Sequence, residues 1–204
     1  MNFLKIKLLI IAVIMFAASS AFASLSYDVN VDTTSLAGTA GYLYLQYNTG
    51  INNTATSIAT VQNFATDGTL GATVPSAIPN GGTYVTGTLP GTVSFTSGYY
   101  ATQDYNQAIT FGNSLNFNLL LPTGTASSAG SNFTLWLAAD AAGATPLKTA
   151  DGLLLTIGLN ADGTATPVIA DAGTTATPTP IPAAAWLLGS GLMGLAGVRR
   201  RKQI

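Results

Sequence analysis

The stretch Ser114-Leu115-Asn116-Phe117-Asn118-Leu119-Leu120-Leu121 decides the fold class of this chain. Polar and apolar side chains alternate along most of it, and Pro122 follows directly. A period of two is typical of a β-strand with one buried face, and proline ends such a strand because it has no N–H to donate. The stretch therefore predicts a sheet with one face turned towards a hydrophobic core.

Similar segments recur on both sides of this stretch. Dipeptides of Asp or Asn with Gly, which favour tight turns, separate several of them, and no segment of the body has a convincing helical period. The pattern predicts an all-β body over residues 24–173, a single antiparallel β-sandwich of jelly-roll type. The expected strands are 25–31, 42–47, 83–89 paired with 92–96 around Pro90-Gly91, 114–121, 133–137, 153–159 and 164–169; the expected turns are at Asp67-Gly68, Asn80-Gly81-Gly82, Asp151-Gly152 and Asp162-Gly163.

The composition excludes several kinds of chemistry. The 204 residues contain no His and no Cys, and only 7% are charged, against roughly 25% in ordinary soluble domains. The chain therefore has no imidazole base, no thiolate, no disulfide and no soft ligand for zinc or haem. Residues 24–198 carry eight Asp against one base, Lys148, a formal charge of −7. Such a body has no basic patch for nucleic acid.

The first 23 residues have the layout of a secretory signal peptide. Lys5 and Lys7 precede an apolar run over residues 8–18, and Ala21-Phe22-Ala23 supplies the small residues of a cleavage site before Ser24. We expect a signal helix over residues 1–23 that signal peptidase removes after Ala23. An uncleaved anchor helix or a buried helix is the alternative, but the apolar run is short for a span of about 20 residues and the cleavage site is well formed.

The last 31 residues predict a linker and a membrane span. Residues 174–180 are a Pro/Thr linker, which we expect to be extended. Residues 181–198 are uncharged, and 18 helical residues reach about 27 Å, close to the thickness of a hydrocarbon core. The basic tail, residues 199–204, should stay on the cytoplasmic side. The body would then lie on the other side of the inner membrane.

This C-terminal region resembles the sorting signal of PEP-CTERM proteins, the substrates of exosortase. The resemblance rests on Pro180-Ile181-Pro182, the Gly-rich apolar span after it and the basic cluster Arg199-Arg200-Arg201. Pro-Ile-Pro stands where the family usually has Pro-Glu-Pro. The resemblance implies that exosortase recognises this tail in the membrane and cuts it near the proline motif. It also implies a Gram-negative bacterium that makes exopolysaccharide. A plain C-terminal anchor is the alternative, but it gives no reason for the Pro-Ile-Pro boundary.

The body also resembles a family of small PEP-CTERM proteins of unknown function. The segments that carry this resemblance are residues 41–47, 63–70, 87–95 and 111–117. The resemblance implies no catalytic residue. The localisation it implies is transient anchoring in the inner membrane with the body in the periplasm, followed by the cell surface or the extracellular space.

The remaining side chains offer little chemistry, and we expect neither an enzyme nor a cofactor. A glycosidase needs a pair of carboxylates across a cleft, but Asp67, Asp151 and Asp162 each precede Gly and are explained as turn residues. Residues 160–164 begin like a calcium loop without the closing Glu, so a hairpin turn is the preferred interpretation and Ca²⁺ a weak alternative.

Two functions follow from these observations. The first is a surface or extracellular-matrix structural protein, sorted by exosortase and associated with exopolysaccharide. The second is a non-catalytic carbohydrate-binding module, in which Tyr99, Tyr100 and Tyr105 of a polar loop would stack on sugar rings.

Overall fold

A computed structural model of the chain describes residues 25–48, 57–74, 84–96, 102–122, 130–160 and 162–179. They form strands and one short 3₁₀ helix, and no helix in these ranges is long and apolar enough to cross a membrane. The elements are β1 (Leu25–Asp32), η1 (Thr34–Leu36), β2 (Ala40–Asn48), β3 (Ile58–Thr66), β4 (Thr69–Val74), β5 (Val85–Thr86), β6 (Val93–Thr96), β7 (Thr102–Thr110), β8 (Ser114–Leu121), β9 (Asn132–Ala138), β10 (Leu153–Leu159), β11 (Ala165–Ile169) and β12 (Thr174–Pro178).

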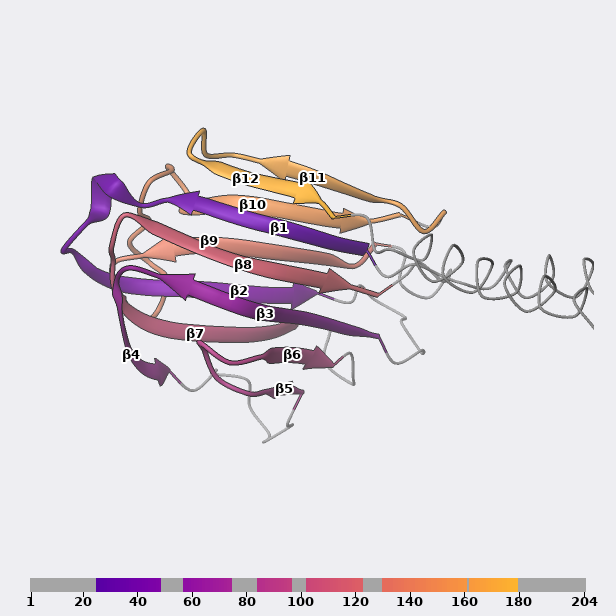
Figure 1. Ribbon diagram of the computed structural model, residues 1–204, viewed down its shortest axis with the longest axis horizontal. Helices are drawn as coiled ribbons and strands as arrows, with labels where there is room; N and C mark the ends of the chain where they lie inside the picture. Colours follow the sequence, from indigo (N-terminus) through magenta and orange to yellow (C-terminus); the bar gives the residue numbers. More distant parts are fainter. Residues whose placement is uncertain are drawn as a thin grey trace, which may run out of the picture. The chain divides into compact units, whose positions relative to one another are not determined.

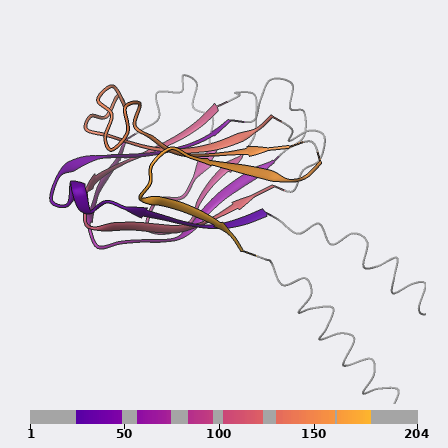
Figure 2. The same cartoon turned by 90° about the horizontal axis from the view of Figure 1, so that it is seen from above.

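The strands form two antiparallel sheets of six strands each. The first, called sheet A here, has the order β12-β1-β8-β3-β6-β5, and sheet B has the order β11-β10-β9-β2-β7-β4. Figures 1 and 2 show the two layers, with β1, β8 and β3 in one and β9, β2 and β7 in the other. The prediction of an all-β body with two antiparallel sheets is confirmed.

The core lies between the sheets because each central strand turns its apolar positions inwards. In β8, Leu115, Phe117, Leu119 and Leu121 are buried and alternate with half-buried polar or apolar positions. Aromatic rings join the two layers: Phe133 of β9 makes edge-on contacts with Phe95 and Phe117 of sheet A, at centroid distances of 6.1 and 6.5 Å. Burial of such apolar surface is the main favourable term in folding.

Two expected strands appear with the predicted bounds, because β8 and β10 coincide with residues 114–121 and 153–159. The expected hairpin around Pro90-Gly91 is present, but β5 covers only Val85–Thr86 of the expected strand 83–89. Asp162-Gly163 lies in the turn between β10 and β11, where the backbone N–H of Gly163 donates to the carbonyl of Asn160. The predicted signal helix and membrane span lie outside the described residues.

The predicted boundary at residue 173 is wrong. Thr174–Pro178, which we expected in a linker, form β12 and pair with β1 in a register that places Thr177 opposite Asp28. Thr179 extends the pairing, because its backbone N–H donates to the carbonyl of Ser26 at 2.8 Å. The segment is extended, as its composition predicts, but β1 supplies a hydrogen-bonding partner, so the folded body continues to Thr179 (Figure 2).

Candidate functional site

Most of the sequence-predicted site residues cannot be placed. The residues of the sorting motif, of the signal cleavage site and of the tyrosine pair all lie outside the described ranges. These residues are Pro180, Ile181, Pro182, Arg199, Arg200 and Arg201; Ala21, Ala23 and Ser24; and Tyr99 and Tyr100.

Tyr105 is described, and its predicted position in a polar loop is wrong. It lies in the middle of β7 with its ring turned into the core and is 4% exposed. Its hydroxyl accepts a hydrogen bond from the backbone N–H of Leu89 at 2.9 Å and donates one to Oε1 of Gln107 at 2.7 Å. Burial raises the pKa of this phenol. A ring enclosed in this way has no face free for a sugar.

The carboxylates at Asp-Gly turns accept hydrogen bonds from backbone N–H groups. Oδ1 of Asp67 accepts hydrogen bonds from the backbone N–H groups of Asn113 and Ser114 at 2.8 and 2.9 Å, and Oδ2 accepts one from the Asn113 side chain at 2.7 Å. These bonds, from Asn113 first, lower the pKa of Asp67 to about 2. Asp67 thereby ties the β3–β4 turn to the β7–β8 turn, which confirms its interpretation as a turn residue.

The candidate calcium loop is likewise a turn. Oδ1 of Asp162 accepts hydrogen bonds from the hydroxyl and the backbone N–H of Thr164, at 2.6 and 2.9 Å, and these lower its pKa. Asn160 bonds Thr164 and Thr166 through its side-chain amide. Within the described ranges, no group of three or more Asp side chains lies close enough together to hold a metal ion.

Lys148, the single base of the body, connects three segments of the fold. Nζ of Lys148 lies 3.1 Å from Oδ2 of Asp171, and the two side chains are only 8% and 12% exposed. The ammonium group also donates to the backbone carbonyl of Asp32. The loop between β9 and β10 is thus held both to the end of β1 and to the β11–β12 turn. Lys148 has a left-handed backbone conformation, with φ of 68°, which is uncommon for a residue with a side chain.

Two aromatic rings lie on the outer face of sheet B. Tyr44 of β2 and Trp136 of β9 are cross-strand partners and stack at a centroid distance of 5.0 Å with an angle of 7° between the rings. The Tyr44 hydroxyl donates to the carbonyl of Asp140 at 2.8 Å, in the loop that follows β9. The Asp140 side chain accepts hydrogen bonds from three backbone N–H groups of the same loop. This loop therefore covers Tyr44, which is 4% exposed.

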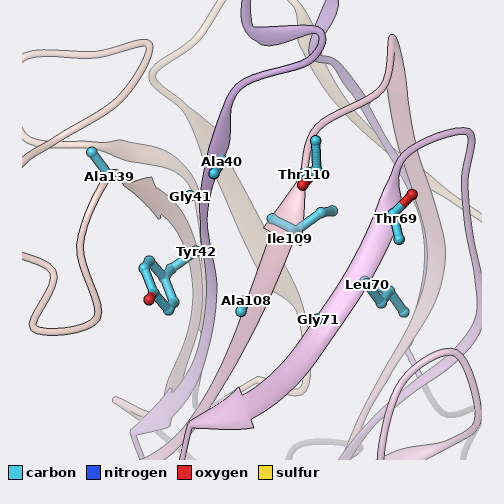
Figure 3. Close-up of a pocket in the computed structure, with 10 residues that line it drawn as sticks. All are labelled: Ala40, Gly41, Tyr42, Thr69, Leu70, Gly71, Ala108, Ile109, Thr110 and Ala139. Atoms are coloured by element: carbon cyan, nitrogen blue, oxygen red, sulfur yellow. The ribbon is translucent and has the colours of Figure 1, made fainter.

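Beside this covered pair, the outer face of sheet B is hollowed. A depression of about 290 Å³ crosses β4, β7 and β2 and reaches the residue after β9. Figure 3 shows its lining, with Tyr42 and Ala139 at one end and Thr69 and Leu70 at the other. The lining residues are Ala40, Gly41, Tyr42, Thr69, Leu70, Gly71, Ala108, Ile109, Thr110 and Ala139.

The hollow exists because small residues occupy neighbouring outward positions. In β7 the buried Gln107 and Ile109 point inwards, so Ala108 and Thr110 face outwards. Gly71 of β4 lies against Ala108, since a Cβ added at Gly71 would come within 3.0 Å of the Ala108 Cβ. Sequence reasoning missed this site, because small residues scattered over three strands form a hollow only when the register aligns them.

Comparison of the chain with protein families, with curated proteins and with solved structures finds no match.

Proposed function

We propose that this chain is an exported, exosortase-processed structural protein of a bacterial surface or extracellular matrix, associated with exopolysaccharide. The observation that carries the proposal is the position of the fold between two processing signals. The folded body begins with β1 at Leu25 and ends with Thr179. The expected signal-peptidase site lies after Ala23, and the resemblance to PEP-CTERM sorting signals begins at Pro180. Removal of both segments would thus leave in place every strand of the described residues.

The strand order supports a jelly-roll topology for the first eight strands. β1 pairs with β8, β2 with β7 and β3 with β6, and these pairs fall alternately in sheet A and sheet B. A long antiparallel ribbon that is rolled up gives this alternation, and jelly rolls are common among lectin and capsid domains. β9 to β11 and β12 extend the two sheets beyond the roll.

A structural role is supported by how the acidic side chains are used. Asp67, Asp140 and Asp162 accept hydrogen bonds from neighbouring turn residues, and Asp171 is paired with Lys148. A carboxylate with a pKa lowered by such bonds is a poor general acid near neutral pH. These groups stabilise the loops of a protein that works by persisting outside the cell.

The proposal is tested by changing the basic tail. Replacing Arg199, Arg200 and Arg201 by Gln removes the positive charge that should stop transfer and mark the tail for processing. We expect the wild-type protein in the surface and extracellular fractions and the triple variant unprocessed in the cells or their membranes. A conservative triple replacement by Lys keeps the charge and should restore the wild-type distribution. Identical fractionation of the Gln variant and the wild type would count against the proposal.

A further inference from the structure

We propose that the hollow on the outer face of sheet B binds a single sugar ring of a neutral polysaccharide. The inference rests on the proposed export into a polysaccharide-containing environment, and it places sugar binding at a surface different from the tyrosines that the sequence indicates. The volume of the hollow, about 290 Å³, is close to the lower limit of small-ligand pockets, roughly 300 Å³. The hollow is therefore suited to one ring rather than to a large ligand.

The hollow brings together hydroxyl groups that the described residues leave without a hydrogen-bond partner. The hydroxyls of Tyr42, Thr69 and Thr110 have no hydrogen-bond partner among the described residues. In contrast, the hydroxyls of Tyr27, Tyr44, Tyr47 and Tyr105 all have partners within the body.

These free hydroxyls lie at both ends of the hollow. Thr69 and Thr110 are cross-strand partners, and Tyr42 is the cross-strand partner of Ala108 on the other side of β7. A hydroxyl both donates and accepts hydrogen bonds, so this lining complements the hydroxyl rim of a sugar. Figure 3 shows the Tyr42 ring standing beside β2, and the flat floor formed by Ala108 and Gly71 lies between the two ends.

The charge of the hollow and of the body favours a neutral ligand. None of the ten lining residues is charged, and the body as a whole carries a formal charge of −7. An anionic ligand would be repelled by this field, and a cation would find no carboxylate in the hollow. A neutral ligand with an apolar face and a polar rim remains, and a pyranose ring has both. Tyr42 can contact its apolar face, and the hydroxyls its rim.

A second copy of the chain is the alternative occupant, and the lining offers it few large apolar side chains. Protein interfaces are built around large apolar side chains that become fully buried. Among the described residues, the exposed large hydrophobic side chains are Ile58, Val168 and Ile169. None of them lines the hollow, whose exposed floor consists of Ala, Gly and Thr.

The test is calorimetric titration of the full chain, in a detergent without a sugar headgroup, with cellohexaose, mannohexaose and chitohexaose. We expect at least one of them to bind. Ala108→Leu fills the floor and should weaken that binding at least about tenfold, a loss of roughly 1.4 kcal/mol. Ala170→Leu is the matched control, because Ala170 is exposed after β11 and far along sheet B from the hollow. It should leave affinity unchanged.

Tyr42→Phe provides a second and milder variant. Because the Tyr42 hydroxyl has no partner among the described residues, its removal should leave the melting temperature unchanged and weaken sugar binding by about two- to tenfold, the value of one hydrogen bond. A normal melting temperature then separates loss of binding from loss of folding.

Three results would overturn the inference. They are no binding of any of the three oligosaccharides, equal affinities of Ala108→Leu and Ala170→Leu, or a change in oligomeric state in Ala108→Leu, which would assign the hollow to a second copy. Processing of the C-terminal tail should be normal in all these variants. Failure of sugar binding would therefore leave the proposed export and processing standing, and failure of processing would leave the calorimetric result standing.

Discussion

Replacing Tyr105 by Phe tests the buried hydrogen-bond network that joins β7 to the β5–β6 turn and to β4. The Tyr105 hydroxyl joins three segments: β7 itself, the β5–β6 turn through the backbone N–H of Leu89, and β4 through Gln107, whose Nε2 donates to the carbonyl of Gly71 at 2.7 Å. Leu89, Tyr105 and Gln107 are 7%, 4% and 2% exposed. Water therefore has little access to these groups when the hydroxyl is removed.

The expected loss follows from the two groups left without a partner. Phe fills almost the same volume, so the core keeps its packing, but the Leu89 N–H and the Gln107 Oε1 each lose a bond. A buried polar group without a partner costs about 1–3 kcal/mol, so two such groups should lower the free energy of unfolding by about 2–6 kcal/mol. For a body of this size each kcal/mol lowers the melting temperature by roughly 2–4 °C, which gives a fall of roughly 4–24 °C.

The assay is thermal and urea unfolding of the full chain in detergent, followed by circular dichroism. Tyr42→Phe is the matched control, since the same atom is removed from a hydroxyl with no partner among the described residues, and its effect should stay within about 0.5 kcal/mol. Equal stabilities of the two variants would refute the reasoning, because the buried network would then contribute nothing.

Two further predictions concern a turn and a strand. Asp67→Ala should be less stable than the wild type near neutral pH. In the folded protein the pKa of Asp67 is about 2, below the ordinary value of about 3.9. Asp67 therefore contributes its full stabilisation above pH 4, and the stability difference should shrink as the pH falls from about 4 towards 2. Unfolding at a series of pH values measures this, and a difference that stays the same down to pH 2 would contradict it. Amide hydrogen exchange followed by mass spectrometry should show residues 174–177 exchanging at least about tenfold more slowly than in a free peptide of the same sequence. Exchange at the free-peptide rate would mean that β12 does not pair with β1.

The sequence correctly predicts the strands in which apolar residues occupy the buried positions. β8 and β10 alternate or run apolar where they meet the core, and proline or Asp-Gly marks their ends. β7 was missed because two of its inward positions are Gln103 and Gln107, buried to 0% and 2% exposure. Its inner face is therefore partly polar. The Gln107 amide is held by hydrogen bonds with the Tyr105 hydroxyl and the Gly71 carbonyl, which no pattern of hydropathy predicts.

β3, β4 and β12 were missed for other physical reasons. The register of β3 shifts between Gln62 and Ala65, where Asn63 has a positive φ of 54°, and this bulge breaks the period of two. β4 is mostly exposed and has small residues, so it lacks an apolar face. β12 reads as a linker because Thr and Pro favour extended backbone without a partner. The partner, β1, is about 150 residues away in the sequence, and only the fold brings the two together.

The candidate site shows the same limit. Each residue of the hollow is ordinary in its own strand, and the feature arises from the registers of β4 with β7 and of β7 with β2. The polar residues around Tyr99, Tyr100 and Tyr105 predict an exposed loop in which these rings could stack on sugars. Tyr105 is nevertheless buried, since strand alternation and the hydrogen bond with Leu89 turn it inwards.

The mass of the mature protein shows whether both ends of the chain are removed. Intact-mass and terminal-peptide measurements would compare the protein from a wild-type strain with that from a strain lacking exosortase. We expect a wild-type product that begins at Ser24, ends near Pro180 and retains β12, and a product from the mutant strain that keeps the tail to Ile204. A wild-type product that still carries Arg199–Ile204 would show that the chain is not an exosortase substrate.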